Sequence, residues 1–95
     1  MITRIVKLTF RPEETPAFLE IFEGSKDAIR NFPGCRHLEL LRAGPIFFTY
    51  SRWDDEAALE KYRRSELFQS TWSRTKALFA ARPEAWTVES LALLN

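Results

Sequence analysis

The chain has 95 residues and a formal net charge of +1 at pH 7, with 14 Lys and Arg against 13 Asp and Glu. A chain of this length builds one modest core, so we expect a single domain over residues 1–95. The balanced charge excludes the strong single-sign field that draws nucleic acid or an anionic membrane. No apolar run approaches the roughly 18 residues that cross a bilayer, so a membrane partner is not expected.

The small number of cysteines and histidines excludes several kinds of site. A single cysteine, Cys35, cannot form an internal disulfide, which favours a cytoplasmic location and a small buried thiol. The N-terminal segment lacks the basic head and long apolar run of a signal peptide. One Cys and one His cannot supply the ligands of a metal site, and no glycine-rich phosphate loop occurs.

The first part of the chain predicts a strand, a helix and a second strand. Residues 2–10 alternate in polarity, and one face carries Ile2, Arg4, Val6, Leu8 and Phe10. Thr15-Pro16 predicts the N-cap and the first residue of a helix, which Pro33-Gly34 ends. Gly24 weakens this helix by about 1 kcal/mol relative to Ala, which indicates close packing at that point. Residues 35–42 alternate again, as a strand does.

The second part predicts two more strands and a helix in two pieces. Residues 46–53 form a third strand, in a hairpin with the second. Asp54 or Asp55 caps the first helical piece, Ser65 restarts the helix, and residues 85–92 form the last strand. The order β-α-β-β-α-β is the ferredoxin-like split βαβ motif. It is an α+β fold with two helices on one face of a four-stranded antiparallel sheet.

The face of the sheet without helices should be polar or covered by a partner. The third strand argues against a polar face, because it carries large apolar groups on both sides: Ile46, Phe48 and Tyr50 on one, Phe47, Thr49 and Trp53 on the other. An exposed apolar patch usually marks an interface, and twofold homodimers are the commonest solution. We therefore expect a homodimer that packs sheet against sheet.

His37 is the candidate general base, because it is the only histidine and shares a strand face with Glu39. A neighbouring carboxylate fixes the tautomer of an imidazole and raises its basicity. Residues two apart on a strand lie about 7 Å from each other, so contact does not follow from the spacing. The alternative interpretation is an ordinary surface or interface histidine.

Thirteen residues, 14% of the chain, are aromatic, and a core of this size does not need them all. Phe68 and Phe79 are expected in the core. Trp53, Tyr62 and Trp72 each carry a polar group that needs a partner when buried. Three such residues near one cleft suit a flat, partly polar ligand, although core packing explains them equally well.

Three motifs, NFPGC at residues 31–35, FFTYSRWDDEAAL at 47–59 and SELF at 65–68, resemble the antibiotic biosynthesis monooxygenase family. The resemblance extends over nearly the whole chain. It implies a dimeric α+β barrel built from two ferredoxin-like sheets, with a pocket in each protomer between sheet and helices. Characterised members oxidise quinols or polycyclic phenols with O₂ and no cofactor, because an electron-rich phenolate can pass an electron to O₂ itself.

The resemblance implies a substrate pocket lined by Thr49, Trp53, Tyr62 and Trp72, with the single histidine as base if it faces inward. Trp53 matches the family outright. Thr49, Ser51 and Tyr62 stand where members often have Asn, Glu and His. Trp72 stands near the helix histidine that binds iron in haem-degrading relatives, so haem ligation is not expected.

Two functions follow from these observations. The first is a cofactor-independent monooxygenase that oxidises a quinol or polycyclic phenolic small molecule with O₂. The alternative is a barrel that binds an aromatic small molecule without chemistry, in line with the altered Glu, His and Asn positions.

Overall fold

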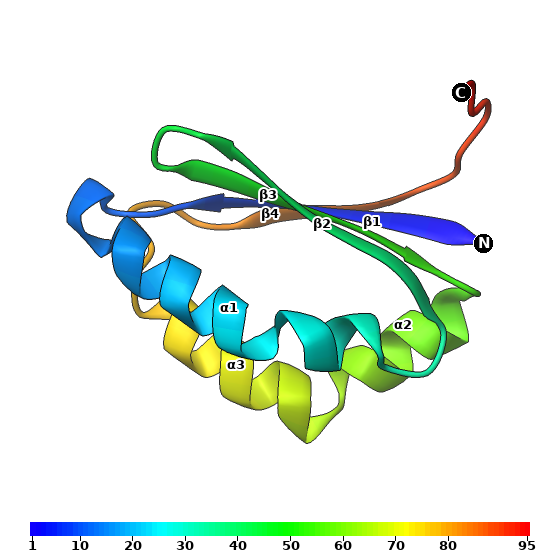
Figure 1. Ribbon diagram of the computed structural model, residues 1–95, viewed down its shortest axis with the longest axis horizontal. Helices are drawn as coiled ribbons and strands as arrows, with labels where there is room; N and C mark the ends of the chain where they lie inside the picture. Colours follow the sequence, from blue (N-terminus) through cyan, green and yellow to red (C-terminus); the bar gives the residue numbers. More distant parts are fainter.

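The computed structural model describes residues 1–95 and places one layer of helices against one face of a sheet (Figure 1). The sheet has the order β2-β3-β1-β4 and consists of β1 (Ile2–Thr9), β2 (Cys35–Ala43), β3 (Ile46–Trp53) and β4 (Glu84–Val88). All three pairings are antiparallel. The helical segments are η1 (Pro12–Glu14), α1 (Thr15–Arg30), α2 (Glu56–Arg63) and α3 (Glu66–Lys76). The predicted α+β, ferredoxin-like fold is therefore confirmed.

The last strand is shorter than the predicted range of 85–92. β4 pairs only with β1, and its register ends at the pair Thr3–Val88. Because β1 begins at Ile2, almost no strand remains for later residues to pair with. Residues 89–95 accordingly leave the sheet and are exposed, and they rise away from the helices in Figure 1.

The helix starts agree with the sequence in two places and differ in one. Asp55 Oδ1 accepts from the Ala58 N–H at 2.8 Å and caps α2, while Ser65 Oγ caps α3 by accepting from the Phe68 N–H at 3.1 Å. The prediction that Thr15 caps α1 is wrong. The 3₁₀ turn η1 runs directly into α1, so the Thr15 hydroxyl donates back to the Pro12 carbonyl instead.

Two glycines have opposite surroundings. Gly34, in the turn between α1 and β2, has φ +90°, and a Cβ added there would lie 2.5 Å from Ala58 Cβ. Glycine therefore permits both the turn and the close approach of α2. The expectation of close packing at Gly24 is wrong, because an added Cβ would meet nothing within 4 Å.

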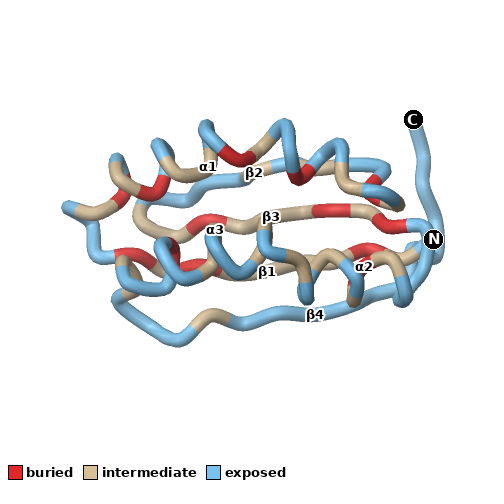
Figure 2. The backbone as a smooth tube through the Cα atoms, turned by 90° about the horizontal axis from the view of Figure 1, so that it is seen from below, coloured by how far each residue is buried: buried red, intermediate tan, exposed pale blue.

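The core is divided into two clusters along the helix–sheet interface. One consists of Leu8, Phe10, Phe18 and Phe47, the other of Cys35, Trp53 and Leu59. Figure 2 shows α1 in one row and α2 with α3 in the other, with buried positions mainly on the sides where the two rows face each other. None of these helices combines the length and apolar character that crossing a bilayer requires.

Candidate functional site

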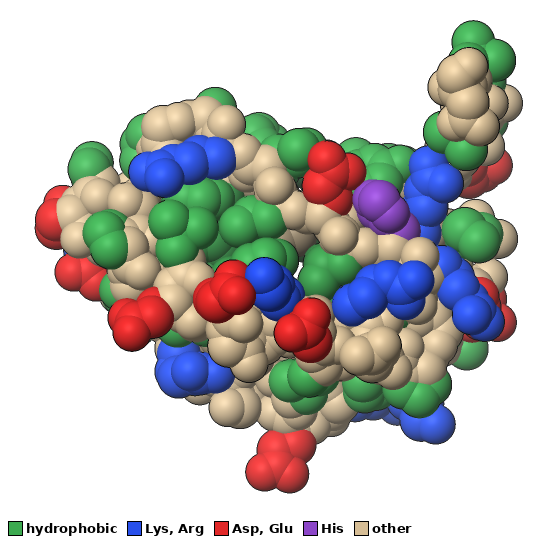
Figure 3. Space-filling model, in the orientation of Figure 1, with side chains coloured by type: hydrophobic (Ala, Val, Ile, Leu, Met, Phe, Trp, Pro, Cys, Tyr) green, Lys and Arg blue, Asp and Glu red, His purple; other side chains and the backbone are tan.

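A cavity of about 340 Å³ lies between the sheet and the two rows of helices. Leu8 and Phe18 of the first core cluster and Leu59 of the second belong to its walls, so it separates the two clusters. Twelve of its 20 lining residues are hydrophobic. Figure 3 shows apolar side chains between the sheet and the helices, flanked by acidic and basic groups. A mainly apolar cavity with a few polar groups is typical of a small-molecule site.

The junction between α2 and α3 positions one wall of the cavity. Ser65 Oγ donates to the Tyr62 carbonyl at 2.6 Å and accepts from the Phe68 N–H, so one side chain connects the end of α2 to the start of α3. This arrangement places Tyr62 from one helix beside Phe68 and Trp72 from the next. The interruption that the sequence predicts at Ser65 thus shapes the site.

The aromatic rings along this wall contact one another in a continuous row. Tyr62 meets Phe68 edge-on at 5.3 Å between ring centroids, and Phe68 stacks on Trp72 at 5.8 Å with an interplanar angle of 11°. Trp72 then contacts Phe79 at 5.6 Å. Rings that support one another in this way hold a flat apolar surface toward the cavity, which suits a planar ligand.

Tyr62 supplies a hydroxyl that remains protonated. Burial raises the pKa of Tyr62 to about 12, with a smaller contribution from the nearby Cys35 thiol. Its Oη makes no hydrogen bond within the chain, and the same holds for the Thr49 hydroxyl across the cavity on β3. Both groups line the cavity and are therefore available to a bound molecule.

Trp53 is placed differently from the other predicted pocket residues. Its side chain is 1% exposed, stacks behind Tyr62 at 4.9 Å and does not line the cavity. The indole N–H donates to Ser51 Oγ at 3.0 Å, so its polar group has a partner inside the protein. Of the two interpretations left open for Trp53, core packing describes its position, and it supports the site from behind.

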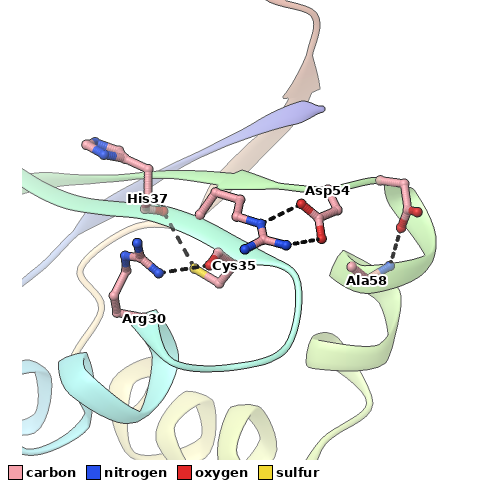
Figure 4. Close-up of polar contacts among 7 residues, drawn as sticks. Arg30, Cys35, His37, Asp54 and Ala58 are labelled. Carbon is pink, nitrogen blue, oxygen red and sulfur yellow. Dashed lines mark hydrogen bonds and ion pairs between the residues drawn. The ribbon is translucent and has the colours of Figure 1, made fainter.

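His37 does not face the cavity. Figure 4 shows its ring on the side of the sheet opposite the helices. It lies edge-on to Tyr50 at 5.5 Å, with Nε2 at 3.3 Å from Glu39 Oε1 and its side chain 45% exposed. The expected pairing with Glu39 exists, but the condition that His37 faces inward is not met. A bulge between Cys35 and His37 shifts the register, and the remaining alternation of β2 directs Leu38 and Leu40 toward the helices.

Cys35 is the buried thiol that the sequence predicts, with 3% exposure. Burial raises its pKa, although the thiol contacts the His37 carbonyl at 3.7 Å. In Figure 4 it lies beneath β2, where Arg30 donates to the Cys35 carbonyl at 2.9 Å. A thiol with a raised pKa in the core is not a nucleophile at neutral pH.

The sequence analysis missed both charged residues of the cavity, Arg4 on β1 and Arg63 on α2. Burial lowers the pKa of Arg4, and the like charge of Arg63 adds to that effect. The sequence pattern could have identified Arg4, because this residue interrupts the apolar face formed by residues 2, 6, 8 and 10. Arg63 carried no comparable signal, since it stands in a charged helical stretch.

No Asp, Glu, His or Cys lines the cavity, so its walls hold no group that ordinarily acts as a base at neutral pH. No cluster of three or more such residues anywhere in the chain could hold a metal ion. The ionisable groups on the cavity are two guanidiniums and one phenol. Such a site can orient and electrostatically stabilise an electron-rich aromatic molecule, but any proton acceptor must be the bound molecule or water.

The fold and the cavity define a ferredoxin-like α+β protein with a small-molecule site between sheet and helices. The family model for antibiotic biosynthesis monooxygenase matches residues 1–73, and the chain belongs to this family.

Solved structures with the same fold cover almost the whole chain at low identity. The crystal structure of an antibiotic biosynthesis monooxygenase has a TM-score of 0.91 at 19% identity, covering 97% of this chain and all of the other. Rv0793 from Mycobacterium tuberculosis has a TM-score of 0.90 at 18% identity, with 99% and 98% covered. PA3566 from Pseudomonas aeruginosa has 0.84 at 23%, with 96% and 94% covered. No curated protein sequence matches the chain.

Proposed function

We propose that this protein is a monooxygenase that oxidises a quinol or polycyclic phenol with O₂, without a cofactor, in the cavity between sheet and helices. The observation that carries the proposal is a 340 Å³ aromatic-walled cavity with two free hydroxyls in a member of this family. Tyr62 and Thr49 would hydrogen-bond the oxygens of the substrate, and Phe68 and Trp72 would pack on its rings.

The reaction balances with the quinol as the source of all four electrons. A quinol and O₂ give a hydroxyquinone and water: one oxygen atom enters a ring C–H bond, and the other leaves as water with the two hydroxyl hydrogens of the quinol. The chain would contribute orientation and the exclusion of bulk water. Ionisation of the quinol increases its electron density, and a neighbouring guanidinium favours the ionised form.

The open face of the sheet supports a homodimer as the working form. Trp86 and Leu41 are each 44% exposed there, and Phe48 and Tyr50 point to the same side. Packing this face on a second copy would cover it and complete a barrel of two sheets. With its single buried cysteine, the protein would act in the reducing cytoplasm.

A second function is favoured by one specific observation, the lack of any carboxylate or imidazole on the cavity walls. The protein would then bind an aromatic small molecule without transforming it. Binding needs only the apolar walls and hydrogen bonds of the cavity, whereas turnover also requires proton transfer.

Oxygen consumption with 1,4-naphthoquinol and with anthrone tests the proposal. Turnover would exceed the buffer rate and give hydroxynaphthoquinone from the quinol and anthraquinone from anthrone, in both cases with water and without H₂O₂. Catalase would then return no O₂, whereas spontaneous oxidation of a quinol yields H₂O₂. Thr71→Phe, which fills the cavity, should abolish the excess rate. Ser70→Phe, at the exposed neighbouring position, should retain it. A buffer-level rate combined with ligand-induced thermal stabilisation would replace the proposal with the binding function.

A further inference from the structure

Arg4 is placed unusually for an arginine in so small a chain. It lies on β1, between two strands of the sheet, and its side chain enters the helix-covered face among Val6 and Leu8. Charged side chains are rarely taken into such a position without a partner, because their desolvation is costly. The position therefore calls for an explanation.

The chain itself provides Arg4 with little compensation. Its hydrogen bond to a side chain goes to the neutral Thr87 Oγ1, at 2.9 Å, and no carboxylate lies within ion-pair distance. Glu60 is the acid that acts on Arg4, but it already pairs with Arg63 at 3.5 Å and Arg64 at 3.2 Å. A guanidinium has five N–H donors, and on Arg4, which lines the cavity, only one of them has a side-chain partner in the chain.

A second guanidinium stands at the edge of the same cavity. Arg63 lines it and also lines a shallow outer hollow together with Glu60 and Thr87, the residue that Arg4 contacts. The side chain of Arg63 is 46% exposed, so it lies on the solvent side of the cavity wall. Two positive groups thus flank one end of a cavity whose walls hold no negative group.

The two guanidiniums suit an anionic group on a ligand. The remaining walls of the cavity indicate what kind of molecule would carry that anionic group. Phe68 and Trp72 present stacked rings, and Tyr62 presents a protonated hydroxyl to the same cavity. We propose that Arg4, assisted by Arg63, binds an oxyanion carried directly on a flat aromatic ring system, so that the cavity selects aromatic carboxylates or ionised phenols over neutral aromatics. The inference deepens the proposed function and rests on its site, but it concerns binding rather than turnover.

Isothermal titration calorimetry near neutral pH tests whether the cavity prefers an aromatic carboxylate. The two probes are 2-naphthoate and its neutral isostere 2-naphthamide. The wild-type protein should bind the naphthoate roughly 10-fold more tightly or better, the effect of about one charged hydrogen bond. Arg4→Met should remove this preference and change the affinity for the amide less than about threefold. Equal affinities for the two probes, or no naphthoate binding, would contradict the proposal that the cavity selects aromatic carboxylates.

A parallel titration with 2-naphthol tests the ionised phenol. Binding should shift its near-ultraviolet absorbance toward that of the naphtholate, and Arg4→Met should abolish the shift. If neither naphthoate preference nor naphtholate absorbance is found, the inference is overturned. Neither probe is a quinol, so these outcomes are independent of O₂ turnover.

Arg64→Met is the matched control, because Arg64 also pairs with Glu60 but does not line the cavity. It should keep the naphthoate preference; a loss equal to that of Arg4→Met would show a general charge effect and overturn the inference. Circular dichroism checks that each variant folds. If Arg4→Met does not, Arg63→Met should weaken naphthoate selectively, and the wild-type comparison of the two probes still decides.

Discussion

The two faces of the sheet differ most clearly along β3. On the covered face, Phe47 and Trp53 are 0% and 1% exposed and pack under the helices. On the open face, Phe48 and Tyr50 alternate with them and are only partly covered. Adjacent residues of similar size thus have different roles, which shows that apolar character alone does not identify the core face.

The polar residues are divided between the faces as well. The open face holds a surface cluster in which Arg52 donates to Tyr50 Oη at 3.0 Å and His37 pairs with Glu39. The covered face holds Arg4, with one neutral side-chain partner, and the free hydroxyls of the cavity. Polar groups that satisfy one another maintain a surface, whereas groups that face a cavity unsatisfied can bind a ligand.

The largest effect is expected from Phe47→Ala, which should lower the free energy of unfolding by about 3–5 kcal/mol through loss of a buried ring. Urea denaturation measures it. Phe48→Ala, at the next position, should cost under about 2 kcal/mol at a protein concentration low enough to keep the protein monomeric, because within one chain its ring is only partly buried. Equal losses would remove the proposed difference between the faces.

Phe48→Asp should turn a dimer into a monomer, seen by size-exclusion chromatography with light scattering. A charge in the centre of an apolar interface is strongly unfavourable, whereas in the monomer the aspartate has Lys7 as its cross-strand neighbour. Leu19→Asp, on the exposed side of α1, should leave the dimer intact. A wild-type monomer would contradict the use of the open face as an interface.

Gly24→Ala should raise the free energy of unfolding by about 0.5–1 kcal/mol, since alanine favours the helix and its methyl group meets nothing within 4 Å. Thermal or urea unfolding detects this change. Gly34→Ala is the opposite case and should destabilise, because φ there is +90° and Ala58 blocks the new methyl group.

The smallest effect is expected from His37→Ala, which should change kcat/KM for a quinol by less than about twofold, too little to come from a general base. Its ring lies on the open face, away from the cavity. Steady-state oxygen uptake measures this, with Tyr62→Phe as the comparison that should reduce turnover. A loss of 100-fold at His37 would restore the role that the sequence indicated for it.

Much of the fold could be predicted because its signals are local. Alternation defined β1 and β3, and the side chains of Asp55 and Ser65 cap the helices at the positions where the sequence places helix starts. The predictions were wrong where another segment sets the end of an element. β4 ends where β1 no longer provides a partner, and Thr15 does not cap α1 because it follows a 3₁₀ turn. Neither event is visible in the periodicity of the segment itself.

The sequence by itself determined the order of the elements and the family, and it left Tyr62 and Trp72 open between a pocket and the core. Only the tertiary structure decided which side of the sheet each residue faces: His37 outward, Trp53 behind the wall and Arg4 into the cavity. The physical reason is that alternation along a strand divides its residues between two faces but does not show which face the helices cover. Only after the helices cover one face is that face the interior. A charged side chain on it, such as that of Arg4, is then partly desolvated and needs a partner.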